Sequence, residues 1–293
     1  MRVLITGCNG QVGHCLTEIL SNTENVSFLA VDREELDITV QKAVIDVVKA
    51  FKPTVIINAA AHTAVDKAED EVELSFAINR DGPKFLAEAA QEVGAAILHI
   101  STDYVFEGNK VGEYVESDVT NPQGVYGASK LAGEIAVAEV CDKHVILRTA
   151  WVFGEYGNNF VKTMLRLAAT RSELSIVGDQ FGGPTYAGDI AKALVEIAKK
   201  ISNTESVEYG IYHYSGEPHV SWYEFADTIF DNAVEQGVLR NKPKLSSITT
   251  EQYSTPAKRP SNSTLSSNKI VHAFEIKTSD WKAAITNLKA YAG

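Results

Sequence analysis

The first half of the chain alternates short, unbroken apolar runs with longer amphipathic segments. The apolar runs lack the alternating polar positions of half-exposed strands, so they predict parallel strands that are buried on both faces. We expect strands at residues 3–6, 27–31, 54–58, 96–101 and 144–148, and helices at 11–20, 40–51, 73–93 and 126–140. This succession predicts an α/β fold with a doubly wound, Rossmann-type parallel sheet built from right-handed crossovers.

The pattern is less regular after residue 148. Amphipathic stretches predict helices at 159–169, 189–200, 222–235 (capped by Ser221) and 280–290, and a strand is expected at 210–214. Residues 178–185 are rich in turn formers and predict a loop, and the polar segment 249–267 is expected to be extended. We predict one domain of residues 1–150 plus approximately 187–214, and a smaller mixed α/β lobe of approximately 151–186 and 215–293.

Composition narrows the class of protein. The chain has 293 residues, of which 45% are hydrophobic and 22% charged, as is usual for globular enzymes. Its apolar runs are too short for a membrane span or a signal peptide. A net charge of −11 argues against a nucleic-acid surface, and three cysteines without metal-ligand spacing suit a reducing compartment. We expect a cytoplasmic protein without membrane or nucleic-acid partners.

Three glycines follow the first predicted strand. Gly7, Gly10 and Gly13 lie between that strand and a helix, and Asp32 ends the second strand. Such a loop brings bare backbone against a pyrophosphate at a helix N-terminus, and the acidic residue accepts from a ribose hydroxyl. A glycine triplet alone is weak evidence, but this context predicts that the first domain binds a dinucleotide and that the second lobe binds the substrate.

Tyr126 and Lys130 are the second chemical signal. Residues four apart on a helix share one face, and an ammonium favours the ionised phenol, so Lys130 is expected to lower the pKa of Tyr126. A phenol tuned in this way can donate a proton to a developing alkoxide. The spacing alone equally fits a solvated surface pair.

Further motifs extend the pattern along the chain. They occupy residues 6–13, 58–66, 101–106, 126–130, 148–154, 157–164, 179–185 and 259–263. With these segments the chain resembles the extended short-chain dehydrogenase/reductase family, and most of them resemble its rhamnose-forming branch. The resemblance implies reduction of the C4 ketone of dTDP-4-dehydro-6-deoxy-L-mannose to dTDP-L-rhamnose, by hydride transfer from NADPH or NADH.

The resemblance also implies the catalytic roles. Tyr126 would protonate the C4 oxygen, Lys130 would hold the nicotinamide ribose, and Thr102 would bind the substrate carbonyl. Asp103 and Tyr104 would touch the sugar, with Tyr104 as the alternative acid. Without the family, Thr102 could equally be a strand-end cap.

Most of the implied cofactor residues follow the first three strands. The set is Gly7, Asn9, Gly10, Gln11, Val12, Gly13, Asp32, Arg33, Asp37, Ile38, Ala59, Ala60, Ala61, Thr63 and Asn79, together with Tyr126 and Lys130. Asp32 favours NADH and the adjacent Arg33 favours NADPH, so both cofactors stay open. Asn79 could instead satisfy buried backbone groups, and Asp37 could instead cap a helix.

The implied substrate residues, besides Thr102, Asp103 and Tyr104, lie in the second lobe. Trp151 would form a wall for the sugar, Asn159 and Lys162 would meet the sugar or the diphosphate, Gln180 would border the nucleotide, and Arg259 would clamp the diphosphate with Asn262 nearby. Core packing is the alternative for Trp151. Arg148 could equally pair with a core carboxylate.

The sequence departs from the family at a metal site. Some members dimerise around magnesium held by glutamates, where this chain has Cys15 and then Gly188 and Asp189. Magnesium needs several hard oxygen ligands, so magnesium is doubtful and no metal is expected. A homodimer stays an open assembly. His62 and His99 are expected to be core or supporting residues.

Two rival functions stay open. Another nucleotide-sugar enzyme of this fold, an epimerase or a dehydratase, would retain its NAD. A non-catalytic regulatory subunit that binds the dinucleotide would not need Thr102, Tyr126 and Lys130.

Overall fold

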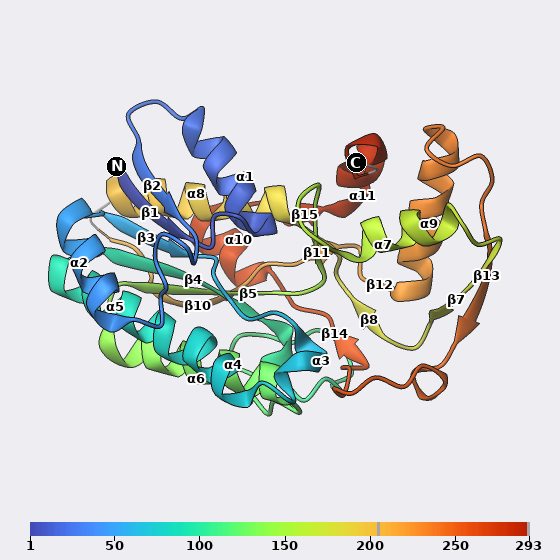
Figure 1. The fold of residues 1–293 in the computed structure, drawn as a ribbon, viewed down its shortest axis with the longest axis horizontal. Helices are drawn as coiled ribbons and strands as arrows, with labels where there is room; N and C mark the ends of the chain where they lie inside the picture. Colours follow the sequence, from blue (N-terminus) through green and yellow to red (C-terminus); the bar gives the residue numbers. More distant parts are fainter. Residues whose placement is uncertain (204–205, 292–293) are drawn as a thin grey trace.

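The computed structural model describes residues 1–203 and 206–291. Its centre is a six-stranded sheet in the order β10-β5-β4-β3-β1-β2, and every neighbouring pair is parallel (Figure 1). The strands are β1 (Arg2–Thr6), β2 (Ser27–Val31), β3 (Val55–Asn58), β4 (Ala96–Thr102), β5 (His144–Thr149) and β10 (Gly210–His213). The prediction of a doubly wound parallel sheet is confirmed.

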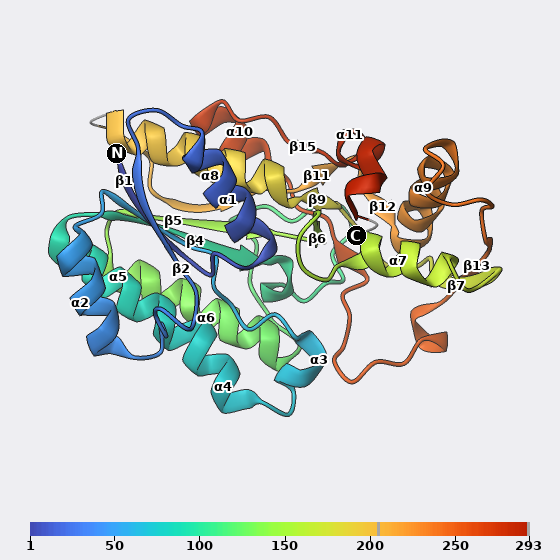
Figure 2. The same ribbon diagram turned by 45° about the horizontal axis from the view of Figure 1, so that its top comes forward.

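Helices cover both faces of this sheet. One face carries α1 (Gln11–Ser21), α8 (Ala187–Asn203) and α10 (Asn268–Phe274), and the other carries α2 (Gln41–Phe51), α5 (Gly82–Val93) and α6 (Val125–Val140) (Figure 2). Each face has its own hydrophobic core, which is why the strand segments are apolar at nearly every position.

The helix expected at 73–93 is interrupted. It consists of α4 (Val72–Phe76), a π-helical turn η1 (Ala77–Asp81) and then α5. Pro83 has no N–H to donate to the carbonyl four residues earlier, that of Asn79, so the α-helical ladder cannot continue through this point. The turn holds the buried side chain of Asn79 close to the site described below.

The second lobe has a separate aromatic core. Phe225 of α9 (Trp222–Glu235) packs edge-on against Trp281 of α11 (Trp281–Ala284) and near Phe160 of α7 (Phe160–Ala168). A parallel pair, β7 (Glu173–Val177) and β13 (Lys244–Ile248), lies at its outer edge in Figure 1. The Ser221 hydroxyl accepts from the Glu224 N–H in a capping box, which confirms the expected start of α9.

Several details differ from the expected elements. The β7–β13 pair and α10 were not expected, and α10 packs on the sheet through Ile270 and Phe274 although the predicted division puts 215–293 in the second lobe. The expected helix at 280–290 is the short α11 followed by 3-10 turns, η4 (Ile285–Tyr291), with a break at Asn287.

The remaining elements are short. They are α3 (Val65–Ala68), η2 (Asp103–Val105), β6 (Val152–Phe153), β8 (Phe181–Gly182), β9 (Thr185–Tyr186), β11 (Gly216–Glu217), β12 (Val220–Ser221), η3 (Thr250–Gln252), β14 (Asn262–Ser263) and β15 (Ser279–Asp280). Strands of two residues carry no hydrophobic period, so the expected loop at 178–185 and the expected extended segment at 249–267 contain them without a sequence signal. No helix within the two described ranges is long and apolar enough to cross a bilayer.

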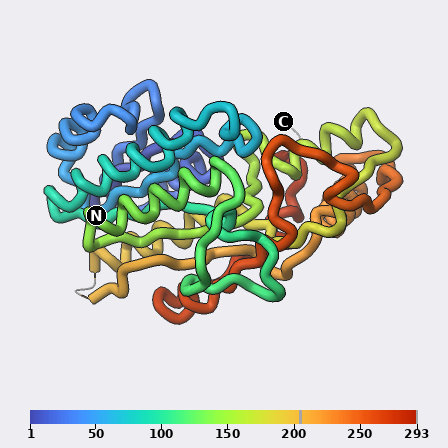
Figure 3. The backbone as a smooth tube through the Cα atoms, turned by 90° about the horizontal axis from the view of Figure 1, so that it is seen from below, coloured from blue at the N-terminus to red at the C-terminus, as the bar shows by residue number. Residues whose placement is uncertain are grey.

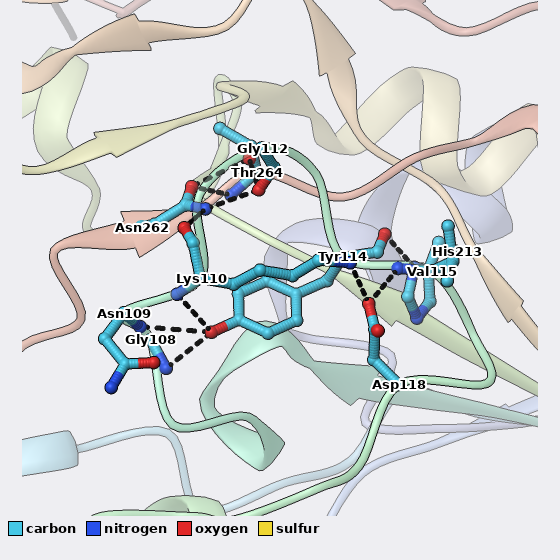
Figure 4. A network of polar contacts seen from close by, with 10 residues as sticks. All are labelled: Gly108, Asn109, Lys110, Gly112, Tyr114, Val115, Asp118, His213, Asn262 and Thr264. Atoms are coloured by element: carbon cyan, nitrogen blue, oxygen red, sulfur yellow. Dashed lines mark hydrogen bonds and ion pairs between the residues drawn. The ribbon is translucent and has the colours of Figure 1, made fainter.

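The C-terminal segment returns from the second lobe to the loop that follows η2 (Figure 3). The Asn262 amide donates to the carbonyls of Lys110 and Gly112, both at 2.7 Å. In the same network the Tyr114 hydroxyl accepts from three successive backbone N–H groups, at residues 108–110 (Figure 4). Asn262 therefore holds this loop, and its amide is already occupied by protein partners.

A buried ion pair joins α6 to the sheet. Arg148 of β5 donates to Glu134 of α6 at 2.6 Å, both side chains are 2% exposed, and Ser101 of β4 donates to the same carboxylate. Arg148 thus has the core carboxylate that the sequence left as one alternative.

We predict that Arg148→Met lowers the free energy of unfolding by about 3–5 kcal/mol, because it leaves the Glu134 charge buried without a partner. Urea denaturation measures this. The control is Lys42→Met, which removes an exposed pair with Asp46 and should cost about 1 kcal/mol or less. Equal losses in both variants would contradict the prediction.

Candidate active site

A cleft of about 490 Å³ opens at the carboxyl ends of β1, β2 and β3. Since β2 and β3 lie on opposite sides of β1, this is the point where the strand order reverses, which is where open α/β sheets bind ligands. The expected cofactor residues that line the cleft are Gly7, Asn9, Gly10, Asp32, Arg33, Asp37, Ile38, Ala59, Ala60 and Ala61.

The glycine loop forms the floor of this cleft. Gly7 has a left-handed φ of 73°, and a Cβ there would lie 2.6 Å from the Ala60 nitrogen. A Cβ on Gly13 would lie 2.1 Å from the Gly7 carbonyl oxygen, so α1 sits directly against the turn. The first N–H groups of α1, which begins at Gln11, are left to face an anion in the cleft.

Asp32 is fixed by backbone donors. Its carboxylate accepts from the Asn9 N–H at 2.9 Å and from the Arg33 N–H at 2.7 Å. The Arg33 side chain is 73% exposed and lies 3.9 Å from the Asp37 carboxylate. The cleft thus holds the fixed carboxylate of Asp32 beside the exposed guanidinium of Arg33. The carboxylate suits a ribose hydroxyl, and the guanidinium suits a phosphate group on that ribose.

The Asp37 carboxylate is occupied locally. It accepts from the Thr39 N–H and hydroxyl at 2.9 and 2.7 Å, and these hydrogen bonds hold the pKa of Asp37 below its usual value. Asp37 borders the cleft, but its carboxylate serves the turn before α2; it does not cap that helix, whose N-cap is Val40.

Some expected cofactor residues lie outside the cleft. Val12 is a core residue of α1, Thr63 is exposed, and the Gln11 carboxamide accepts from the Asn159 side chain at 3.0 Å. Asn79 uses its whole amide within the protein: it accepts from the His62 N–H and donates to the His62 carbonyl and to Ser129. Asn79 therefore ties the loop after β3 to α6.

Sequence analysis missed part of the lining. The additional residues are Leu36, Thr39, His62, Leu74, Ala77 and Ile78. Leu74 and Ile78 are four apart on the helical segment that faces the cleft, so an apolar pair at that spacing was the available signal.

Thr102 and Tyr126 meet at the end of β4. Thr102 ends the strand, and Tyr126 is the second residue of α6. Burial raises the pKa of Tyr126, and a hydrogen bond with the Thr102 side chain offsets part of that shift. Tyr126 therefore keeps its proton at neutral pH and is available as an acid.

Lys130 is held beneath the strand. Its amine is 2% exposed and donates to the Ile100 carbonyl at 2.7 Å, and burial lowers the pKa of Lys130 to about 8. The expected lowering of the Tyr126 pKa is not what the structure shows. The pKa of Tyr126 is shifted upward by burial, and the Lys130 ammonium is directed at the backbone of β4 rather than at the phenol.

Asp103 and Tyr104 complete this end of the sheet. Thr102 donates to the Asp103 carboxylate at 3.0 Å, and burial raises the pKa of Asp103 to about 6. The ring of Tyr104 lies edge-on to that of Tyr126, with centroids 5.4 Å apart. Burial raises the pKa of Tyr104 to about 12.

The expected substrate residues of the second lobe have protein partners. Trp151 stacks on Trp222 with centroids 3.5 Å apart. Asn159 caps α7 and donates to Gln11 and to the Gly154 carbonyl, and the Gln180 amide donates to Thr250. Trp151 also lies against Gly182, where an added Cβ would come within 2.5 Å of the indole ring, so its role as a wall for a ligand stays a prediction. Lys162 lies in the first turn of α7.

Arg259 joins the C-terminal segment to the first domain. Its Nη2 donates to Asp66 at 2.6 Å, while Nη1 is buried and has no hydrogen-bond partner among the residues that the structure describes. Arg259 Nη2 is thus engaged by Asp66, and the charge of Arg259 offsets part of the rise in the Tyr104 pKa that burial causes.

The described ranges contain no group of three or more His, Cys, Asp or Glu side chains placed to hold a metal ion. Cys15 is buried in α1, and Asp189 accepts from Ser279 at 2.9 Å. The expectation that no metal binds here stays a prediction.

We predict that Asp32→Ala weakens NADH binding by about 10- to 100-fold, the loss of a charge-assisted hydrogen bond, and weakens NADPH binding less. Fluorescence titration with each nucleotide measures both dissociation constants. Glu34→Ala, which removes an exposed neighbouring carboxylate, is the control. Equal losses for the two nucleotides would remove Asp32 from the ribose contact.

Comparison with known proteins gives the family. A family model described as RmlD substrate binding domain matches residues 1–292. The dTDP-4-dehydrorhamnose reductase of Aggregatibacter actinomycetemcomitans is 55% identical over 99% of both chains. The crystal structure of a dTDP-4-dehydrorhamnose reductase from Clostridium acetobutylicum is 41% identical, with a TM-score of 0.90 and 98% of both chains covered. That of the Bacillus anthracis enzyme in complex with NADP is 40% identical, with a TM-score of 0.86 and coverage of 97% of this chain and 96% of that one. The chain therefore belongs to the RmlD substrate binding domain family.

Proposed function

We propose that the chain reduces the C4 ketone of dTDP-4-dehydrorhamnose to dTDP-L-rhamnose with NADPH or NADH. The observation that carries the proposal is the match to named reductases over the whole chain, second lobe included. The geometry supports it, because Thr102 ends β4 and Tyr126 begins α6 in the same sheet whose strands β1, β2 and β3 open onto a cleft of about 490 Å³.

The residues of the cleft fit a nicotinamide dinucleotide. Gly10 and the first turn of α1 would hold the pyrophosphate, and Asp32 and Arg33 would bind the adenosine ribose or a phosphate on it. When bound, the reduced cofactor supplies a hydride. Positioning it against the ketone contributes most to the rate, since orientation alone is worth several orders of magnitude.

Tyr126 and Thr102 act on the ketone oxygen. Thr102 donates a hydrogen bond to it, and Tyr126 transfers its proton to it as negative charge develops. Because the pKa of Tyr126 is raised, its phenol is still protonated when negative charge develops on the ketone oxygen. The Thr102 hydroxyl has a single hydrogen, which it donates to Asp103 in the structure, so donation to the ketone requires this hydrogen to turn from the Asp103 carboxylate to the ketone oxygen.

The second lobe and the C-terminal segment hold the nucleotide diphosphate. Arg259, whose Nη2 is fixed by Asp66, and Lys162 are the two cations that we assign to the diphosphate. Trp151, which is half-buried, contacts the deoxysugar.

The proposed compartment is the cytoplasm, which suits the free thiols of Cys8, Cys15 and Cys141. A homodimer that does not depend on magnesium is the proposed assembly.

The direct test is to mix the protein with dTDP-4-dehydrorhamnose and each reduced cofactor, follow the reduced-nicotinamide absorbance, and identify the sugar formed. We expect one cofactor oxidised per dTDP-L-rhamnose. An epimerase or dehydratase would instead convert its substrate with retained NAD, and a regulatory subunit would oxidise no cofactor.

We predict that Tyr126→Phe lowers kcat by roughly 10²–10⁴-fold and leaves the cofactor dissociation constant within about twofold, because it removes only the transferred proton. Stopped-flow absorbance measures the hydride step. Tyr209→Phe, at a half-buried tyrosine beside the opposite end of β10, is the matched control. Near-normal turnover of Tyr126→Phe would transfer the acid role to Tyr104.

We predict that kcat/KM for the reduced cofactor decreases as pH rises through about 8, the pKa of Lys130, and that the decrease follows the loss of a single proton. Below that pH the amine is charged and can hold the nicotinamide ribose, and above it the charge is lost. A pH profile of initial rates measures this. Because the pKa of Tyr126 is raised, Tyr126 does not titrate in this range. A profile that stays flat to pH 10 would contradict the role of Lys130.

A further inference from the structure

The helix that carries the proposed acid begins without a cap of its own. The first residue of α6 is Val125, its N-cap is Gly124, and the Gly124 backbone brings no side-chain acceptor. The N-terminal N–H groups of a helix have no partner within the helix, so they take acceptors from elsewhere. Here the Val125 N–H donates to the Glu69 carboxylate at 2.9 Å. Glu69 lies just after α3, in a different segment of the chain.

Gly124 makes room for that carboxylate. A Cβ on Gly124 would lie 2.7 Å from Glu69 Oε1, so a side chain there would displace the glutamate. The backbone of Gly124 is extended, with φ of −153° and ψ of 172°, a conformation that other residues also adopt. The position therefore does not need glycine for its backbone, but a side chain there would force Glu69 Oε1, the end of a flexible side chain, to move from its present place.

The rest of α6 is seated by backbone contacts. A Cβ on Gly127 would lie 2.2 Å from the Tyr104 carbonyl oxygen, and one on Gly133 would lie 2.0 Å from that of Asn79. Those contacts fix how close α6 comes to η2 and η1. The end of the helix next to Tyr126 is held by Glu69.

The other side of α3 is anchored as well. Asp66 accepts from Arg259 Nη2 at 2.6 Å and from the Ala257 N–H at 3.1 Å. The short helix α3 therefore lies between the C-terminal segment and the start of α6, with one carboxylate toward each.

We infer that Glu69 is a positioning residue for Tyr126: its carboxylate fixes the first turn of α6 so that the phenol stays against Thr102. This inference rests on the proposed function. It differs from ordinary helix capping, which would add stability without affecting where the phenol lies.

The first test is Glu69→Ala, with Glu69→Gln as the conservative variant that keeps an acceptor oxygen. Misplacing a catalytic group by about 1 Å costs on the order of 100-fold in rate, so kcat of Glu69→Ala should fall about 10- to 100-fold. The cofactor dissociation constant should stay within twofold, and Glu69→Gln should recover most of kcat. With deuterated cofactor, the isotope effect on kcat should rise as hydride transfer becomes limiting. An unchanged kcat in Glu69→Ala would overturn the inference.

Gly124→Ala tests the same contact from the other side. Its methyl group displaces the carboxylate and leaves Glu69 in the sequence, so its kcat should match that of Glu69→Ala. Glu73→Ala, which removes an exposed carboxylate on the neighbouring helix α4, should behave as the wild type. Wild-type turnover in Gly124→Ala would contradict the inference.

A double variant separates position from stability. In Glu69→Ala/Gly124→Ser the serine hydroxyl caps α6 from its own N-cap, so the melting temperature should recover. The contact between α6 and α3 is not restored, so kcat should stay low. Recovery of kcat together with the melting temperature would show that Glu69 serves stability alone.

A spectroscopic readout does not need turnover. The ¹³Cζ resonance of Tyr126, assigned by its loss in Tyr126→Phe, should move in Glu69→Ala and Gly124→Ala at fixed pH but not in Glu73→Ala. If the wild type reduced no sugar while this resonance moved, the proposed function would fail and the positioning would stand. If turnover were present and the resonance did not move, the positioning would fail alone.

Discussion

The close packing of α6 against its neighbours is the constraint on which the candidate site depends. Gly127 and Gly133 let the helix approach the backbone of Tyr104 and Asn79 at distances that no Cβ allows. Below them, the buried pair of Glu134 and Arg148 ties the same helix to β5. A phenol on the first turn of this helix has little freedom, so its distance from Thr102 is set by packing rather than by its own rotamer. Preorganisation of this kind is what makes a single hydrogen-bond donor effective in catalysis.

Charge shapes the site in a protein whose net charge is −11. Its proposed ligands are anions, so the overall field opposes them and local donors must hold them. In the proposed function, the cofactor is held by backbone N–H groups at the start of α1, which need no countercharge. The proposed substrate contact is Arg259, whose guanidinium is already neutralised in part by Asp66. The ion pair with Asp66 keeps the guanidinium in place before a diphosphate binds. The same pair reduces the net positive charge that Arg259 presents to the diphosphate.

The sequence predicted the longer, regular elements better than the short ones, for a physical reason. Strand 27–31 and helix 222–235 lie where they were expected, because a doubly buried strand is an unbroken apolar run and Ser221 with Glu224 forms a capping box. Predicting the π-helical turn requires knowing which backbone carbonyl Pro83 leaves without an N–H donor. Two-residue strands such as β8 have no period, and the β7–β13 pair forms between segments about seventy residues apart in the chain.

The residues of the candidate site also differ in how well the sequence predicted their roles. Residues placed by backbone geometry, such as Gly7 and Ala60, line the cleft as expected, because the motif fixes their positions within the turn. Side chains with amide groups were harder to assign: Asn79, Asn159 and Gln180 hold other protein groups, and the partner of an amide depends on the tertiary structure. Nothing in the sequence marked Glu69 as a site residue, because its hydrogen-bond partner is a backbone N–H group. The state of Tyr126 also depends on burial, which no spacing shows. A phenol that keeps its proton at neutral pH is in the protonation state that reduction of a ketone requires, so the burial that the sequence did not reveal sets the state in which Tyr126 meets the substrate.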